Sequence, residues 1–394
     1  MGDALKSNVF NKWLILIFVL FLVLSENPLN TIGSLYVPLQ RVTVVTILLM
    51  VMFIITLFRR KILVDMPVLM LLLLRIPYYI LNSLLDGATR TTFQAHYLIV
   101  LIGPIVFFCI YGMVENYIHI ILKLLLKISI IIVAIQVHTS LLFLFFQGHA
   151  LYQIKLSIGI PLGYSNTIAS IALIQIFLAY VLLEKKIYFL ISITSLLCTL
   201  SKSAFLVFGV IFLIVLFVDS IRKKKLGIFI RYTLLIILIL YFANHFFGEY
   251  FSVYTKTIQL LLDNDLVSIN NGRTRIFYGY LKDISQKPLL GWGLGKYNLV
   301  NGMGHNFLLQ SLFAGGIVGT ILYYMPVILI IRNSLRWENK QMQMALLLLV
   351  IVCMGHGIFE NVFFTIPCEF LFWIYLSLIY KEGSVNEQNS MYYS

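Results

Sequence analysis

The chain carries little charge for its length. Only 11% of its 394 residues are charged, and Asp and Glu together number 16, whereas about 25% of residues are charged in soluble domains. So few polar groups cannot cover a chain that is 60% hydrophobic, which excludes a soluble globular enzyme and a disordered protein. The net charge of +13 would suggest nucleic acid as the partner of a soluble chain. Most of these cations flank apolar runs, however, so we expect a membrane protein with no nucleic-acid partner.

Cysteine is scarce as well. The chain has four cysteines, all in or beside apolar segments. They share no metal-ligand spacing, so we expect small buried hydrophobes rather than disulfides, and neither a metal site nor a cofactor. These residues are Cys109, Cys198, Cys353 and Cys368.

Long apolar runs are abundant. A helix needs about 20 residues to cross the hydrocarbon layer, and we identify twelve stretches of this kind. They predict an all-α polytopic membrane protein with about twelve transmembrane helices. The predicted spans are residues 13–24, 42–58, 67–85, 97–114, 128–146, 166–183, 187–200, 203–218, 228–246, 306–331, 343–360 and 366–380.

The distribution of Lys and Arg predicts the orientation of these spans. With the N-terminus in the cytoplasm, 18 cations fall in cytoplasmic segments and four in the short loops on the opposite side. Both termini are therefore predicted to be cytoplasmic. Residues 1–246 carry the first nine spans, 306–380 the last three, and 381–394 a cytoplasmic tail. Residues 247–305 form one long extracytoplasmic loop, and loops of such length are usually functional.

One segment of the long loop has helical periodicity. It predicts an amphipathic helix that begins after Gly272 and ends before Pro288. Arg273 lies in its apolar stripe, where a cation is costly unless it meets an anion or a cavity. Arg275 points to the opposite face. The stripe consists of Arg273, Ile276, Phe277, Tyr280, Leu281 and Ile284.

Two features lie near the outer end of the tenth span. The glycine-rich run from Gly291 to Gly295 predicts either a flexible loop or a backbone nest for an anion, with Gly293 at its centre. His305 directly precedes a helix, whose positive end favours a neutral imidazole that can act as a general base. The alternative is a histidine that caps the helix together with Asn306.

Polar residues beside other spans are further candidates. Lys202 lies in a very short outer turn, where its ammonium is either solvated or held near headgroup depth. Arg75 is intramembrane and therefore a functional candidate by default, and a structural pair with Asp86 or with a carboxylate of another helix is the alternative. His356 and Glu360 are one turn apart at the outer end of the eleventh span. They predict a hydrogen-bonded structural pair, because a metal site needs more ligands.

These residues predict an outward-facing cluster of Lys, Arg and His above a helical bundle. Cations beside a neutral base suit a lipid-linked pyrophosphate and an attacking sugar hydroxyl. A flippase or transporter is the alternative of a different class, but it would be expected to show paired broken helices, midplane charges or repeated halves. We find a single intramembrane arginine and an asymmetric outer loop, which favour an enzyme.

The combination of motifs resembles the O-antigen ligase and O-antigen polymerase superfamily. The motifs are Asn271-Gly272-Arg273, Lys287-Pro288-Leu289-Leu290-Gly291-Trp292-Gly293 and His305-Asn306-Phe307-Leu308-Leu309. Upstream, Gly163-Tyr164-Ser165-Asn166 and Thr199-Leu200-Ser201-Lys202 also resemble family positions. The family usually has arginine where Lys202 stands, and lysine binds phosphate without the bidentate fork of arginine.

The resemblance implies metal-independent, inverting glycosyl transfer from undecaprenyl-pyrophosphate-linked oligosaccharides at the outer face of the bacterial cytoplasmic (inner) membrane. It implies that Arg273 and Lys202 hold the pyrophosphate and that His305 activates the acceptor hydroxyl. Glu360 could reach the site only from another helix, so it is the reserve candidate for the base. The substrate-binding residues that we predict are Asn306, Gly293, Asn166, Arg275 and Glu360.

We interpret the chain as a polymerase that joins repeat units into O-antigen or capsular polysaccharide. The alternative within the superfamily is a ligase that transfers the glycan to lipid A core. The expected partners are membrane lipid, a flippase and a chain-length regulator.

Overall fold

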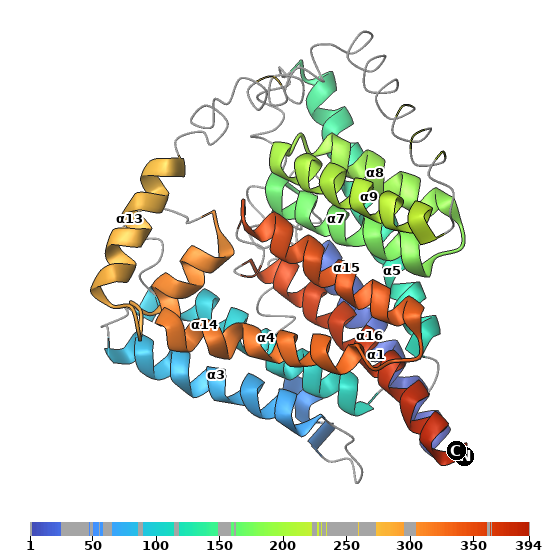
Figure 1. Cartoon of the computed structure of the whole chain (residues 1–394), viewed down its shortest axis with the longest axis horizontal. Coiled ribbons are helices and arrows are strands. Elements are labelled where there is room, and N and C mark those ends of the chain that lie inside the picture. The colour runs from blue at the N-terminus through green and yellow to red at the C-terminus, as the bar shows by residue number, and fades with distance from the viewer. Residues whose placement is uncertain are drawn as a thin grey trace.

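The computed structural model shows a helical protein (Figure 1). It describes residues 2–24, 47, 50–54, 56–57, 65–85, 90–113, 118–148, 159–160, 163–222, 227, 230, 234, 259, 273–294, 305–360, 363 and 365–393. About half of the span predicted at 42–58, almost all of the span predicted at 228–246 and much of the long loop lie outside these residues.

The described helices follow most of the predicted spans. They are α1 (Gly2–Val23), α3 (Met66–Leu85), α4 (Arg90–Met113), α5 (Ile118–Phe146), α7 (Ser165–Leu182), α8 (Lys186–Cys198), α9 (Lys202–Arg222), α13 (Arg273–Gln286), α14 (Phe307–Ser334), α15 (Lys340–Gly357) and α16 (Ile366–Tyr393). A short antiparallel hairpin, which the sequence did not predict, precedes α7. Its strands are β1 (Gly159–Ile160) and β2 (Gly163–Tyr164).

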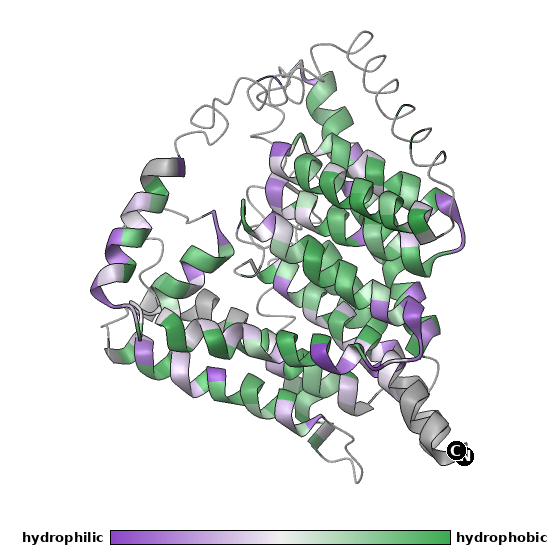
Figure 2. Cartoon of the chain, viewed as in Figure 1, coloured by the Kyte–Doolittle hydropathy of each residue, from purple (hydrophilic) through white to green (hydrophobic). Residues whose placement is uncertain are grey.

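Several helices are long and apolar enough to cross a membrane. Among the described residues, five meet both criteria, and shorter apolar helices accompany them. Figure 2 shows that hydrophobic residues cover most of the length of the bundle helices, whereas α13 is mixed. The polytopic helical fold is confirmed, while the total of twelve spans stays a prediction. The five are Met66–Leu84, Ile118–Phe146, Ser165–Leu182, Phe307–Ser334 and Lys340–Gly357.

Two predicted boundaries differ from the structure. Helix α5 begins at Ile118, well before the span predicted at 128–146, so Lys123 and Lys127 lie on a helix rather than in a loop. The ammonium of Lys127 lies 5.8 Å from the ring centroid of Tyr188, which gives this cation a partner within the bundle. Helix α16 continues to Tyr393, so the predicted tail is helical over almost all of its length.

Helices α1 and α16 pack antiparallel. Phe21 stacks on Phe370 with ring centroids 3.9 Å apart, and Phe18 meets Tyr375 edge-on at 6.2 Å. The start of α1 and the end of α16 therefore lie at the same end of the bundle, as the prediction of both termini on one side of the membrane requires. Which side this is stays a prediction.

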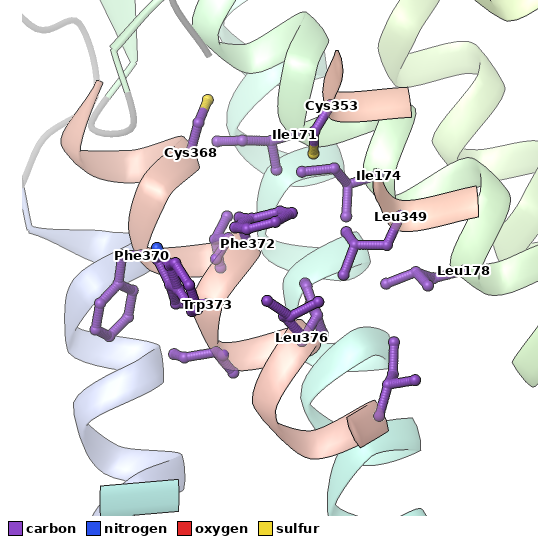
Figure 3. Packing of buried hydrophobic residues seen from close by; sticks show 14 of the residues in the cluster. Ile171, Ile174, Leu178, Leu349, Cys353, Cys368, Phe370, Phe372, Trp373 and Leu376 are labelled. Carbon is purple, nitrogen blue, oxygen red and sulfur yellow. The ribbon is translucent and has the colours of Figure 1, made fainter. Parts of the chain in front are cut away.

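One part of the hydrophobic core lies where α16 packs against α7 and α15 (Figure 3). All four cysteines are free thiols, and three of them are buried. They act here as small hydrophobes in a close-packed interior. The residues of this part of the core include Ile171, Ile174, Leu178, Leu349, Cys353, Phe372, Trp373 and Leu376.

Arg75 forms a buried ion pair with Glu369 of α16. Both side chains are 0% exposed, and the closest N–O distance is 3.7 Å. Nε and Nη2 of Arg75 also donate to Val100 O, and its guanidinium lies 4.6 Å from the Tyr323 ring centroid. The structural alternative for Arg75 is thus confirmed, with a carboxylate of another helix as partner. Glu369, which lies inside the span predicted at 366–380, was not named as this carboxylate, and Asp86 lies outside the described residues.

Helix α14 is interrupted at Gly316, and a loop fills the interruption. Gly316 has φ +59° and ψ −163°, a non-helical conformation that costs glycine little. The carbonyls of Phe313 and Ala314 accept hydrogen bonds from the amides of Trp292 (2.7 Å) and Gly293 (2.9 Å). On the other side of the break, Ile317 N donates to Pro288 O at 2.9 Å, and Val318 N donates to Leu289 O at 3.2 Å. Backbone groups released within a membrane-spanning helix must be paired inside the protein.

Glycines of the loop and of α14, together with polar side chains of α3, allow these segments to pack closely. A Cβ atom at Gly291 would lie 2.4 Å from Gly316 N, and one at Gly315 would lie 2.6 Å from the hydroxyl of Tyr79. Tyr78 donates to Gly315 O at 2.6 Å, and Asn82 donates to Ala314 O at 3.0 Å. The close approach of α3, α14 and the loop therefore depends on glycine at these positions.

Candidate functional site

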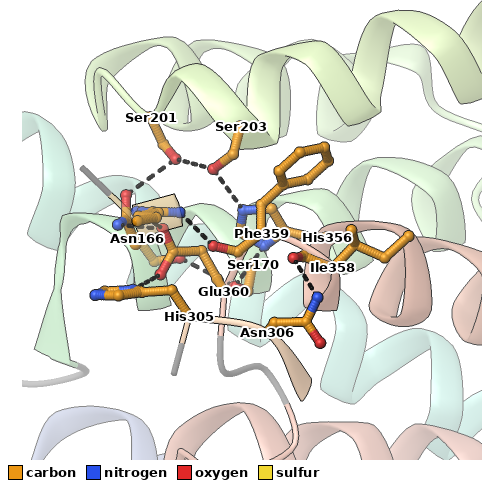
Figure 4. Close-up of polar contacts among 11 residues, drawn as sticks. Asn166, Ser170, Ser201, Ser203, His305, Asn306, His356, Ile358, Phe359 and Glu360 are labelled. Atoms are coloured by element: carbon orange, nitrogen blue, oxygen red, sulfur yellow. Dashed lines mark hydrogen bonds and ion pairs between the residues drawn. The ribbon is translucent and has the colours of Figure 1, made fainter. Parts of the chain in front are cut away.

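Five helix ends bring polar side chains together at the end of the bundle opposite the start of α1 and the end of α16. Figure 4 shows the polar contacts of this cluster. They are the starts of α7, α9 and α13, the residues before α14, and the residues after α15. Because successive spans run in opposite directions, segments far apart in the sequence meet here. Asn166 comes from α7, Arg273 from α13, His305 precedes α14, and Glu360 follows α15.

Glu360 is the centre of this cluster. Its Oε1 accepts hydrogen bonds from Asn166 Nδ2 (2.7 Å) and Arg273 Nη2 (2.7 Å), and its Oε2 lies 3.1 Å from His305 Nδ1. Burial raises the pKa of the Glu360 carboxyl, but the hydrogen bond from His305 and the charge of Arg273 outweigh this effect and hold the pKa below its ordinary value. The carboxylate is therefore ionised at neutral pH.

Arg273 is the first residue of α13. The helix has the predicted boundaries, and Tyr280 and Ile276 of its stripe pack towards α14, although Leu281 is 51% exposed. Besides Glu360, the guanidinium binds Phe359 O through Nη1 at 2.5 Å. A guanidinium has five N–H donors, so these two contacts leave others for a ligand. The side chain of Arg275 lies outside the described structure.

His305 presents its ring from a strained backbone. Its φ is +45°, in the left-handed region that non-glycine residues rarely adopt. In the described chain, the other non-glycine residue with positive φ is Leu200, at +53°, directly before Ser201. Both thus adjoin this cluster, and such conformations concentrate at functional sites. With Nδ1 directed to Glu360, His305 Nε2 has no hydrogen-bond partner among the described residues.

Asn306 caps helix α14. Its Oδ1 accepts from the amides of Leu308 and Leu309, both at 3.0 Å, and its Nδ2 donates to Ile358 O at 3.0 Å. Both ends of the Asn306 amide are engaged. This residue therefore fixes the turn that carries His305 to the segment that carries Glu360.

Lys202 is the first residue of α9, and the serine residues before and after it are both hydrogen-bonded to the cluster. Ser201 Oγ donates to Asn166 Oδ1 at 3.1 Å, and Ser203 Oγ lies 3.3 Å from His356 Nε2. Lys202 itself is half-buried, and its ammonium makes no hydrogen bond to the described part of the chain. Lys202, which has no carboxylate partner among the described residues, thus lies between the two residues that contact Asn166 and His356.

His356 has different partners from those predicted. Its Nδ1 lies 2.8 Å from Ser170 Oγ and its Nε2 3.3 Å from Ser203 Oγ, while its contact with Glu360 is the backbone bond Glu360 N to His356 O. The predicted side-chain pair of His356 and Glu360 is therefore wrong. The sequence contained one indication of the true arrangement, because Asn166 and Ser170 are polar residues one turn apart on an apolar helix.

Gly293 lies away from this cluster. Its amide donates to Ala314 O, and its φ of +80° and its contact with Ser83 place it in the loop that fills the break in α14. The amide is thus engaged and does not form part of an open anion nest. The glycine-rich run, as far as it is described, is a packed and hydrogen-bonded segment rather than a flexible loop.

The comparison with known families agrees with the motifs. Residues 187–324 match the family model described as O-antigen ligase. This region of the chain is therefore similar to O-antigen ligases. The resemblance to the O-antigen polymerase and ligase superfamily is thereby confirmed over this region, and together with the long apolar helices it supports a membrane enzyme of the polymerase or ligase type. No curated protein matches the chain.

The region that matches the O-antigen ligase model contains three of the site residues but not the whole cluster. Lys202, Arg273 and His305 lie inside the matched region, whereas Asn166 and Glu360 lie on either side of it. The contacts of Glu360 therefore join the matched domain to helices α7 and α15, which the match does not include.

Proposed function

We propose that the protein is a polymerase that joins oligosaccharide repeat units, carried on undecaprenyl pyrophosphate, at the outer face of the bacterial cytoplasmic membrane. The observation that carries this proposal is the juxtaposition of the Arg273 guanidinium with an imidazole whose Nε2 has no described partner. Ser201, the residue before the cation Lys202, binds Asn166 of the same cluster. A lipid pyrophosphate needs cations, and an attacking sugar hydroxyl needs a base.

The reaction is an inverting displacement. The acceptor hydroxyl oxygen forms a bond to the anomeric carbon of the donor, and the bond from that carbon to the pyrophosphate oxygen breaks. The hydroxyl proton passes to His305 Nε2, and the electron pair of the broken bond stays on the departing pyrophosphate. Arg273, through its remaining N–H groups, and Lys202 stabilise this developing charge.

The test uses purified protein in vesicles with lipid-linked repeat units as both donor and acceptor. A polymerase produces a ladder of lipid-linked products and releases undecaprenyl pyrophosphate. The ligase is the second candidate, because the matching family model is described as O-antigen ligase. Glycan transfer to lipid A core without a ladder would establish the ligase and reject the polymerase.

A transporter would not release undecaprenyl pyrophosphate in this assay. The structure contains two features that transporters use, the break in α14 and the buried pair of Arg75 and Glu369. The break, however, is filled by residues 288–293, and the pair lies 0% exposed between helices. Neither feature offers a site to a substrate in this conformation.

A further inference from the structure

We propose that Glu360 is a positioning residue that fixes His305 with its proton on Nδ1, so that Nε2 is the atom that takes the acceptor proton. This inference rests on the proposed function. It gives Glu360 a role that differs from both the reserve base and the substrate ligand that the sequence suggests.

The hydrogen bond between His305 and Glu360 determines which ring nitrogen carries the hydrogen. An ionised carboxylate only accepts hydrogen bonds. The distance of 3.1 Å between His305 Nδ1 and Glu360 Oε2 therefore requires the hydrogen to be on Nδ1. A neutral imidazole carries one N–H, so the lone pair that can accept a proton is on Nε2.

The orientation of the His305 ring determines which of its nitrogens a substrate can reach. Figure 4 shows the far side of the His305 ring pointing away from Glu360 and from the serine residues of the cluster. The side chain of His305 is 29% exposed, while that of Glu360 is 9% exposed. Nε2 is thus the nitrogen that a substrate hydroxyl can approach.

Glu360 itself is poorly suited to act as the base. Three donors, from Asn166, Arg273 and His305, already occupy its two oxygens. Burial raises the pKa of the carboxyl, but the His305 hydrogen bond and the Arg273 charge lower the pKa below its ordinary value. A carboxylate that is stabilised in this way is a weak base. It is well placed, however, to stabilise the imidazolium that forms when His305 Nε2 takes a proton.

Two other side chains hold the Glu360 carboxylate in place. Arg273 Nη2 and Asn166 Nδ2 both bind Oε1, which leaves Oε2 directed at His305. Asn166 in turn accepts from Ser201 Oγ, the residue before Lys202. The same carboxylate therefore sets the position of the base relative to Arg273, and through Asn166 it is joined to the turn that carries Lys202.

The first measurement uses the unmodified protein without substrate. Nitrogen NMR of ¹⁵N-histidine-labelled protein in vesicles, at mildly alkaline pH where imidazoles are neutral, reports which ring nitrogen carries the proton. Subtraction of the His305→Ala spectrum identifies the resonances of His305. We expect the hydrogen on Nδ1, and a hydrogen on Nε2 would overturn the proposal. Because no substrate is present, this result does not depend on whether the polymerase reaction is correctly proposed.

The second measurement uses Glu360→Gln, with Glu338→Gln as the matched control because Glu338 is exposed on the turn before α15. A glutamine amide can donate to Nδ1 and so no longer specifies the tautomer. We expect kcat to fall by about 10²–10⁴-fold, with little change in KM for the lipid-linked donor. In the NMR spectrum, the Nδ1–H form should lose its predominance. The control should behave like the unmodified protein.

Two results of this second measurement would overturn the proposal. A raised KM at unchanged kcat would make Glu360 a substrate ligand. Unchanged kcat together with an unchanged tautomer would make the carboxylate dispensable. If Glu360→Gln does not fold, the tautomer of the unmodified protein still decides the question. Absence of polymer from the unmodified protein would instead reject the proposed function and leave the tautomer result standing.

Discussion

Arg273 Nη2 lies 2.7 Å from Glu360 Oε1, across 87 residues of sequence. The contact joins the first residue of α13 to the segment after α15, so it fixes the outer helix against the membrane bundle. It also balances the guanidinium charge with a carboxylate before any substrate is bound. A pyrophosphate therefore meets an arginine that is already oriented.

Replacing Arg273 should be far more damaging than replacing its neighbour. We expect Arg273→Ala to lower the rate of polymer formation by at least roughly 10- to 150-fold, because a charge-assisted hydrogen bond contributes about 1.5–3 kcal/mol. Arg275→Ala, on the same helix, is the matched control and should be milder. Gel analysis of lipid-linked glycans measures both, and greater sensitivity of Arg275 would contradict the assignment of the two helix faces.

Lys202 should act through its charge. We expect Lys202→Ala to weaken the donor interaction by about tenfold or more, since a cation that faces pyrophosphate is lost. Lys202→Arg should retain activity, because guanidinium also binds phosphate. Lys186→Ala is the control, since Lys186 begins α8 at the other end of the bundle. Donor titrations with the purified variants measure the effect, and equal KM values for Lys202→Ala and the unmodified protein would exclude Lys202 from the site.

The loop that fills α14 should depend on Gly316. Gly316→Ala places a Cβ atom 2.3 Å from Leu289 O and forces alanine to adopt φ +59°, so we expect loss of about 2 kcal/mol or more in stability. Gly209→Ala is the matched control, because a Cβ atom at Gly209 in α9 meets nothing within 4 Å. That change should be neutral or slightly stabilising. Thermal unfolding in detergent compares the two, and equal stabilities would disprove the close packing at Gly316.

The charge of Glu360 should also give the protein a specific acid sensitivity. Its pKa is lowered from 4.5 in the folded state. The stabilisation that results is fully present above the ordinary pKa and is lost as pH falls through the folded one. The stability difference between the unmodified protein and Glu360→Gln should thus be constant near neutral pH and shrink below about 4.5. A difference that grows on acidification, measured by thermal unfolding, would show the opposite sign of the pKa shift.

Local patterns predicted the parts of the fold that depend on neighbouring residues. The stripe that contains Ile276 and Tyr280, with Pro288 as its limit, was sufficient to predict α13. The alternation of Lys and Arg among the loops predicted only that Lys202, Arg273 and His305 lie on the same side of the membrane. These features follow from periodicity and from the requirement to cross a bilayer.

Other parts of the fold and of the site depend on contacts between residues that are far apart in the sequence, which no local pattern reveals. The break in α14 became visible only with the loop from Pro288 to Gly293, whose carbonyls and amides replace the missing helical partners. The central place of Glu360 results from contacts with residues 55, 87 and 194 positions away in the sequence. Glu369 was not predicted as the partner of Arg75, because a single carboxylate in an apolar span does not indicate which other helix it contacts.

The last prediction assigns the proton transfer to His305. His305→Ala should insert into the membrane at a normal level but leave single repeat units on the lipid carrier, because a general base contributes about 10²–10⁴-fold. His305→Gln should be equally inactive, since its amide can still bind Glu360 Oε2 but cannot take a proton. The comparison separates chemistry from structure, because Asn306 holds the turn independently through Leu308, Leu309 and Ile358. Near-normal polymer from His305→Gln would mean that the ring only positions its neighbours, and the acceptor proton would then have to leave by another route.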